Sequence, residues 1–245
     1  MWMIVGAVLI AATVGAHAEG GIASSLLASP IGDAVGPKAP WRLSLLPRQT
    51  KPVTEFSVVE LDTQRVLRVV SSKSYGKLVH AFPATSVPPK RLTWDWRVDQ
   101  SPEADLRSRS GDDVALRVCA FYDWPTQRMP AIDRMRLALA ETLAGESLPG
   151  AAVCYVWDTT LPTGTVMPNA FSRRIRMIVV DGDGASKTAW REHIRDLQKD
   201  FRTAFADEWE EGDVLPPLLA VAIGADSDNT GGEGLAYVRS ISLGR

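Results

Sequence analysis

The residues best suited to chemistry form the run DSDNTGG at positions 226–232, which directly follows an apolar strand-like segment. Asp226, Asp228 and Thr230 occupy the alternating positions that supply oxygen ligands in calcium loops, so they are the predicted metal ligands. The acid expected at the twelfth position is replaced by Tyr237, and the flanking segments are strands rather than helices. An EF-hand is therefore excluded.

Two explanations of this run remain open. A different oxygen-ligand site would suit Ca²⁺, because a hard cation needs only several converging carboxylates and carbonyls. A tight hairpin, in which Asp and Asn bond their own backbone, explains the run equally well. A second acidic turn, DGDG at 181–184, would lie at the same sheet edge if the two preceding strands are parallel, and at the opposite end if they are antiparallel neighbours.

Other polar and aromatic side chains lie near predicted strand ends. Arginine would clamp a carboxylate or sugar hydroxyls, and a tryptophan face would pack against a sugar ring. The structural alternative is an ion pair for each arginine and core packing for the tryptophans. Trp124 is the tryptophan expected to be exposed, since it ends a strand before Pro125. The predicted ligand-binding residues are Asp112, Asp113, Arg117, Trp124, Trp157, Arg176, Asp228 and Asn229.

Signatures of catalysis are sparse. Beyond the N-terminal segment only His80 and His193 occur, so a three-histidine zinc site cannot be built, and His193 is expected to be solvated. No H-E-x-x-H or G-x-S-x-G motif is present. Asp112 or Asp113 with Asp228 would supply the carboxylate pair of a glycosidase, but acids are too numerous for spacing to single out a pair. No catalytic residue is predicted, and the balance favours a protein that is not an enzyme.

The elements that must position these residues are mainly strands. The predicted strands, rich in Val, Leu, aromatic or alternating residues and bounded by turn formers, are 41–46, 56–61, 65–71, 77–82, 91–98, 113–122, 153–157, 174–180, 218–225 and 235–243. Ten short strands with few long gaps predict an antiparallel β-sandwich or jelly roll, similar to galactose-binding domains, as a single domain over 41–245.

Two accessory helices are expected to cover sheet edges or ends. The segment 130–143 places Ile132, Met135, Leu139 and Leu143 on one face. The segment 188–205 places Trp190, Ile194, Leu197, Phe201 and Phe205 on one face.

The N-terminus predicts an exported protein. An apolar stretch followed by Ala16-His17-Ala18 is typical of a signal peptide over residues 1–18, with an uncleaved short anchor as the alternative. A flexible lead-in over 19–40 follows, and the expected location is periplasmic or secreted. No later segment is apolar and long enough to span a bilayer.

Charge and cysteine content restrict the partners. With Lys+Arg 27 and Asp+Glu 29, the chain lacks the basic excess that nucleic-acid binding needs. The two cysteines, Cys119 and Cys154, permit a disulfide in an oxidising compartment, but two buried thiols are slightly favoured.

Five ordered stretches carry a family resemblance: LTWDWRV at 92–98, GDDVALRV at 111–118, LPGAAVCYVW at 148–157, RIRMIVV at 174–180 and VAIGADSDNT at 221–230. Together they resemble a bacterial exported family catalogued as domain of unknown function 3047, over 41 to 243. The resemblance implies export and a β-sandwich but no activity.

The sequence thus favours a non-catalytic binding module for carbohydrate or another polar envelope ligand, with Ca²⁺ as a candidate bound ion. The alternatives are a carboxylate-based glycan-acting enzyme and a protein-binding scaffold.

Overall fold

The computed structural model describes residues 27–31, 36, 38–46, 48–82, 89–144 and 148–244. The predicted signal peptide (1–18) and most of the predicted lead-in (19–40) lie outside the described residues. Within the described ranges, no helix combines the length and apolar character needed to cross a bilayer.

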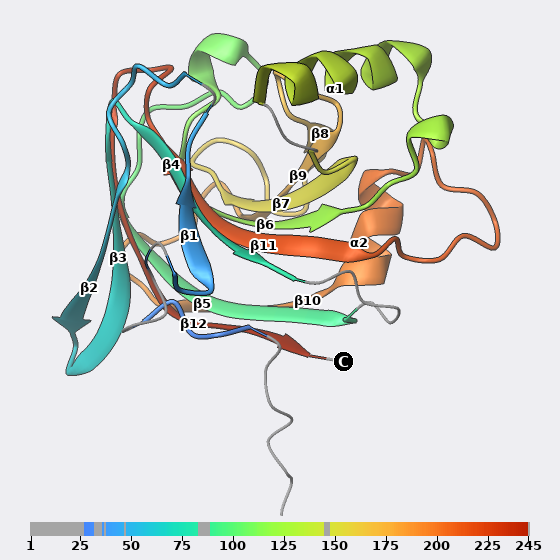
Figure 1. Ribbon diagram of the computed structural model, residues 1–245. Helices are drawn as coiled ribbons and strands as arrows, with labels where there is room; N and C mark the ends of the chain where they lie inside the picture. Colours follow the sequence, from blue (N-terminus) through green and yellow to red (C-terminus); the bar gives the residue numbers. More distant parts are fainter. Residues whose placement is uncertain are drawn as a thin grey trace, which may run out of the picture.

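Two β-sheets form the body of the protein (Figure 1). The larger sheet has the order β1-β4-β11-β6-β7-β9-β8, with β1 (Trp41–Ser44), β4 (Tyr75–Ala81), β11 (Leu218–Asp226), β6 (Val114–Tyr122), β7 (Ala151–Trp157), β9 (Ile175–Asp181) and β8 (Val166–Pro168). The smaller sheet has the order β10-β5-β12-β3-β2, with β10 (Arg191–Asp196), β5 (Arg91–Gln100), β12 (Glu233–Gly244), β3 (Gln64–Ser72) and β2 (Glu55–Leu61). Neighbouring strands are antiparallel except for β7 and β9, which are parallel. The predicted β-sandwich or jelly-roll class is confirmed.

All ten predicted segments are strands, but the predicted helix over 188–205 is wrong in its first half. Residues 191–196 form β10, which pairs antiparallel with β5 and alternates half-buried and exposed positions. The helix α2 (Leu197–Ala204) begins only after Asp196, whose side chain accepts a hydrogen bond from the Lys199 amide. Pairing with the open edge of β5 therefore outweighs the helical spacing of the apolar residues.

The space between the sheets is filled by large side chains. Trp94, Trp96 and Tyr155 are fully buried there, and α2 contributes Phe201. Trp124 packs against Phe201 with ring centroids 5.3 Å apart and is 2% exposed, so its predicted exposure is wrong. A large aromatic ring at this strand end removes more apolar surface from water by packing on α2 than by facing solvent.

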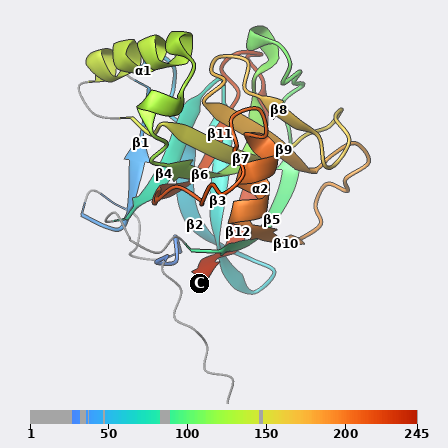
Figure 2. The ribbon, with the colours of Figure 1, turned by 90° about the vertical axis from the view of Figure 1, so that its right-hand side faces the viewer.

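The helix α1 (Ala131–Ala144) forms where the sequence predicts it, but with a different orientation. Its predicted buried residues Ile132, Met135 and Leu139 are 48%, 63% and 61% exposed. Asp133 and Leu137, one turn apart, are the buried residues instead. Figures 1 and 2 show α1 above the larger sheet, on the side away from the smaller sheet. The short 3₁₀ helices η1 (Arg109–Gly111) and η2 (Thr126–Arg128) lie in the connections on either side of β6.

The larger sheet therefore has an inner face toward the smaller sheet and an outer face toward α1. On the outer face Cys119 of β6 lies directly opposite Cys154 of β7, and the two are joined in a disulfide. The preference for free thiols is wrong, because sequence alone did not reveal this cross-strand register.

Candidate functional site

Both acidic turns lie at the same edge of the larger sheet. β11 is antiparallel to β6, β6 is antiparallel to β7, and β7 is parallel to β9. β9 and β11 consequently run in the same direction, and Asp181 and Asp226 end them at one edge. β6 begins at that edge, just after Asp113. The two turns nevertheless contact different residues, because β6 and β7 lie between β11 and β9 in the sheet.

The 226–232 run is held by Asp113 through three hydrogen bonds. One carboxylate oxygen of Asp113 accepts the Asn229 amide at 3.1 Å. The other accepts the amide and the hydroxyl of Thr230, at 2.7 and 2.6 Å. The Asn229 side chain donates to the Arg109 carbonyl at 2.7 Å. The hydrogen-bonded turn anticipated from sequence is present, but its main acceptor comes from a distant segment.

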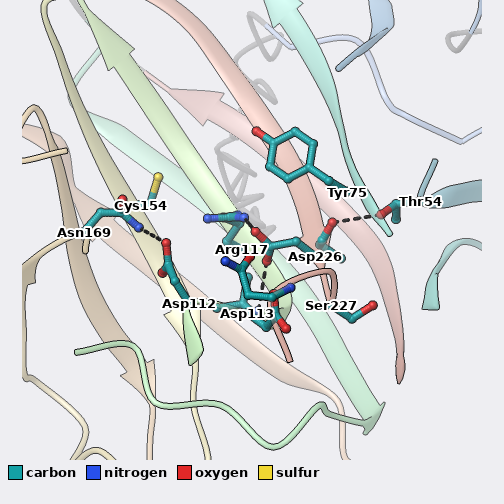
Figure 3. A network of polar contacts seen from close by, with 12 residues as sticks. Thr54, Tyr75, Asp112, Asp113, Arg117, Cys154, Asn169, Asp226 and Ser227 are labelled. Atoms are coloured by element: carbon teal, nitrogen blue, oxygen red, sulfur yellow. Dashed lines mark hydrogen bonds and ion pairs between the residues drawn. The ribbon is translucent and has the colours of Figure 1, made fainter. Parts of the chain in front are cut away.

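Asp226 forms a buried ion pair with Arg117 at the start of β6 (Figure 3). The second oxygen of Asp226 accepts the Val114 amide at 2.9 Å. Burial raises the pKa of Asp226 to about 7, and Arg117 opposes that rise. Burial also disfavours the charge of Arg117, but the Asp226 carboxylate outweighs it and raises the pKa of Arg117. Two donors on one carboxylate favour the charged pair.

The predicted metal ligands are only partly brought together. Carboxylate oxygens of Asp113, Asp226 and Asp228 lie within 4.8 Å of one another. Thr230 instead donates its hydroxyl to Asp113. Burial, followed by the charge of Asp113, raises the pKa of Asp228. Because Arg117 already supplies a positive charge at Asp226, this geometry suits a structural hub better than a cation cage.

Asp112 faces away from this hub. Its carboxylate accepts the Asn169 side chain at 2.6 Å, and its other oxygen is buried without a partner among the described residues. Burial raises the pKa of Asp112. Nothing in the sequence pattern linked Asn169 to Asp112, because they are separated by 57 residues.

The Asp181 turn joins the two sheets. Its carboxylate accepts Trp96 at 2.7 Å, His193 at 2.9 Å and Arg191 at 2.5 Å. Burial opposes the charge of Asp181, but hydrogen bonds from His193 and Trp96 outweigh it and lower its pKa. The side chain of His193 is only 12% exposed, so the expectation of a solvated histidine is wrong. Its position on β10 rather than on a helix is the reason.

Three of the predicted ligand-binding residues are parts of the core. Trp124 and Trp157 are 2% and 3% exposed. Arg176 is 6% exposed and binds both carboxylate oxygens of Asp207, at 3.0 and 2.9 Å. For these residues the geometry matches the structural alternative.

One accessible space lies between α1 and the outer face of the larger sheet. It is a groove of about 390 Å³. Its walls include Lys77, Phe121, Arg136, Phe171, Arg173 and Ile175. A smaller hollow of about 50 Å³ shares Lys77, Phe121 and Ile175 with it and adds Tyr75 and Arg117. We call the two together the outer groove.

Of the predicted ligand-binding residues, Arg117 is the one that lines the outer groove. The sequence of β6 could have indicated the residues that face the groove. Arg117, Cys119 and Phe121 alternate there with apolar residues such as Val118. In a strand this spacing places Arg117 and Phe121 on one face. The contribution of α1 carried no comparable signal, because its helical spacing indicated the opposite orientation.

Comparison with known proteins now identifies the family. The model described as "Protein of unknown function (DUF3047)" matches residues 39–242. The chain belongs to the DUF3047 family. No curated protein matches it.

Two solved structures resemble this DUF3047 member. One is a family 12 xyloglucanase from Bacillus licheniformis in complex with ligand, at 9% identity, covering 81% of this chain and 88% of that chain, with a TM-score of 0.41. The other is the xyloglucanase domain of NopAA, a type three effector from Sinorhizobium fredii, in complex with cellobiose, at 8% identity, covering 84% and 96%, with a TM-score of 0.36. Neither likeness assigns a function to the DUF3047 chain.

The acids of the outer groove determine what chemistry it supports. Among the residues that the structure describes, Asp133 is the one acid that lines it, and this carboxylate is buried 4.0 Å from the Arg174 guanidinium. In the described part of this DUF3047 member, no two carboxylates line the groove on opposite sides.

Proposed function

We propose that this protein is a non-catalytic binding module that holds a carbohydrate in the outer groove. The observation that carries the proposal is the groove itself, about 390 Å³ in volume and walled by aromatic and cationic side chains. Ligand sites in proteins are typically clefts of roughly 300–1,000 Å³ with an apolar lining and a few placed polar groups.

The aromatic residues of the groove support a sugar ligand. Phe171 is 51% exposed at one end, and Phe121 is half-buried on the sheet. An exposed aromatic ring packs against the C–H face of a sugar, and neighbouring guanidinium or ammonium groups donate hydrogen bonds to its oxygens. Arg136 is placed to do this from the α1 wall, and Arg173, which also pairs with Asp207 at 2.9 Å, from the opposite wall.

A glycan hydrolase is the second candidate, and the Asp113–Asp228 pair is what favours it. Their carboxylate oxygens are close enough to act together. A hydrolase needs one carboxylic acid and one free carboxylate flanking the bond, roughly 5 to 10 Å apart. Both oxygens of Asp113 are already occupied by Asn229 and Thr230, so the binding module is the better account. Release of reducing ends from any oligosaccharide would overturn this choice.

We also propose that the protein is exported to the cell envelope or medium. The apolar N-terminal segment with Ala16-His17-Ala18 supports this. The Cys119–Cys154 disulfide supports it independently, because disulfides persist mainly in oxidising compartments. Detection of the protein in the periplasm or medium tests the proposal, and retention in the cytoplasm contradicts it.

The binding proposal is tested by thermal shift with a panel of neutral and acidic oligosaccharides. A ligand that binds only the folded state raises the melting temperature. The variant Phe171→Ala should abolish the shift. The matched control Met135→Ala, which truncates an exposed apolar residue on the far side of α1, should retain it. If no oligosaccharide raises the melting temperature, a protein-binding scaffold becomes the better explanation.

The calcium prediction is tested in the same assay. Because Arg117 neutralises Asp226, we expect neither Ca²⁺ nor EDTA to shift the melting temperature. A rise with Ca²⁺ that EDTA reverses would show that the Asp113, Asp226 and Asp228 cluster binds a cation.

A further inference from the structure

The outer groove repeats one pairing of side chains, a cation beside an aromatic ring. At the end near η1, the Arg109 guanidinium lies 5.4 Å from the centroid of Phe171. On the sheet, the Lys77 ammonium lies 5.3 Å from the centroid of Phe121.

Beyond Lys77, Tyr75 of β4 and Arg117 of β6 line the smaller hollow together. The Lys77–Phe121 pair also joins β4 to β6, whereas Arg109 in η1 and Phe171 before β9 flank the other end. Two cation–aromatic pairs along one groove suit a ligand whose own chemistry repeats.

The charge of the groove is unbalanced. Among the described residues, four cations line its larger part, namely Lys77, Arg136, Arg173 and Arg174, against the one acid Asp133. Arg173 is ion-paired at 2.9 Å with Asp207, and the two side chains are 56% and 44% exposed. Arg174 is committed to the fold, since it binds the Gly150 carbonyl at 2.9 Å and the Glu208 carboxylate at 2.7 and 2.8 Å. Arg136 has no carboxylate partner among the described residues and is exposed on the groove side of α1.

We propose that the ligand is a linear acidic oligosaccharide carrying a carboxylate on each sugar ring. This inference rests on the proposed carbohydrate-binding function and names its substrate class. Each sugar presents an apolar C–H face to an aromatic ring and its carboxylate to the neighbouring cation. Arg136 binds one of these carboxylates from the α1 side.

The shape of the outer groove favours a polysaccharide over an acyl chain. The larger space continues into the smaller hollow along Lys77, Phe121 and Ile175, so it is extended rather than a single deep pocket. Lys77 on the sheet and Arg136 on α1 place separate charges in the larger space, whereas a fatty acid has one charged end. A fatty acid that competes with the oligosaccharide is therefore an outcome that contradicts the proposal.

The experiment compares trigalacturonate with its fully methyl-esterified form by isothermal titration calorimetry on the full chain. The two probes share every ring and differ in charge. We expect the acid to bind at least about tenfold more tightly at low salt, because one charge-assisted hydrogen bond contributes that much. Its affinity should fall as salt is raised, because salt screens exposed charges.

The variants Arg136→Gln and Arg134→Gln form a matched pair on α1. Both arginines are exposed, but only Arg136 lines the groove. Arg136→Gln should weaken binding of the acid about tenfold and leave the ester within about twofold. Arg134→Gln should leave both affinities within about twofold.

The outcomes separate this inference from the function on which it rests. Equal affinity for the acid and the ester, or equal effects of the two variants, would overturn the acidic ligand while keeping carbohydrate binding. Binding of neutral oligosaccharides alone would do the same. Failure of every oligosaccharide, acidic or neutral, would overturn both proposals.

Discussion

The two faces of the larger sheet are built from the same strands but have opposite character. On β6, Val118 and Tyr122 point inward and are fully buried, whereas Arg117, Cys119 and Phe121 belong to the outer face. The inner face is packed with large aromatic rings. The outer face holds an ion pair, a disulfide and an open groove. Because side chains alternate between the two faces of a strand, β6 supplies core residues on one face and groove residues on the other.

The two helices follow the same division. Four residues of α2, Leu197, Asp200, Phe201 and Ala204, are buried. The described part of α1 buries only Asp133 and Leu137. It lies over the outer face of the larger sheet (Figure 1) and forms one wall of the groove. A helix that packs fully leaves no room for a ligand, so the incomplete packing of α1 is what creates the site.

The largest effect is expected from truncating the inner face. Phe201 is fully buried and stacks with Phe205, with ring centroids 4.7 Å apart. Phe201→Ala should lower the free energy of unfolding by about 3–5 kcal/mol, whereas the control Met135→Ala on α1 should change it by less than about 0.5 kcal/mol. Denaturant unfolding measures both. If Phe201→Ala does not fold, Phe201→Leu gives a smaller measurable loss, and equal losses at the two helices would contradict the comparison.

Next in size is the disulfide on the outer face. Cys119 and Cys154 are separated by 35 residues, so the bridge limits the freedom of the unfolded chain. The double substitution Cys119→Ala/Cys154→Ala should cost about 2–4 kcal/mol of unfolding free energy. Parallel unfolding of the wild-type chain with and without reductant provides the check. A loss below about 1 kcal/mol would mean that the outer face owes its stability to other contacts.

Substitutions of the two residues in the buried ion pair should have non-additive effects on the free energy of unfolding. Arg117→Met leaves the Asp226 carboxyl buried without its cation, while Asp226→Asn keeps an acceptor for the Val114 amide. In a double-mutant cycle the two changes should couple by about 1–3 kcal/mol, because each single variant strands the other group. Effects that add within about 0.5 kcal/mol would show that the pair does not hold the hub together.

The smallest expected effect is a pH dependence of stability caused by His80, which lies at the edge of the inner face. Burial lowers the pKa of His80 below its ordinary value of 6.5, and its ring accepts the Ala28 amide at 3.4 Å. The unfolded chain therefore binds the proton more readily than the folded one. Stability from neutral His80 should be lost as pH falls from 6.5 through the lower folded pKa.

Urea unfolding at pH 7.5 and pH 5.0 tests this prediction for the wild-type chain and for His80→Gln. The variant should lose less stability between the two values, since it has no group to protonate at this position. An identical loss in both proteins would assign the pH dependence to other residues.

The sequence predicted the strands whose residues follow a clear local pattern. It failed where contacts between residues far apart in the chain determine the structure. Alternation located strands such as Leu92 to Val98, and runs of β-forming apolar residues located strands such as 153–157, which is buried on both faces. These patterns missed β10, whose Arg191 to Asp196 pairing with β5 depends on an edge far away in sequence. They also missed the Asp113 contacts with Asn229 and Thr230, which span more than 110 residues.

The central claim is that the outer groove holds the ligand, and thiol protection tests it most directly. The sequence has two cysteines and both are in the disulfide, so a single new thiol can be followed alone. Ala140 lines the groove, and Ala138 is exposed elsewhere on α1. Alkylation by iodoacetamide would be timed for Ala140→Cys and Ala138→Cys, with and without saturating trigalacturonate. We predict that the ligand slows alkylation in Ala140→Cys alone. Equal rates with and without bound ligand in both variants would contradict the account.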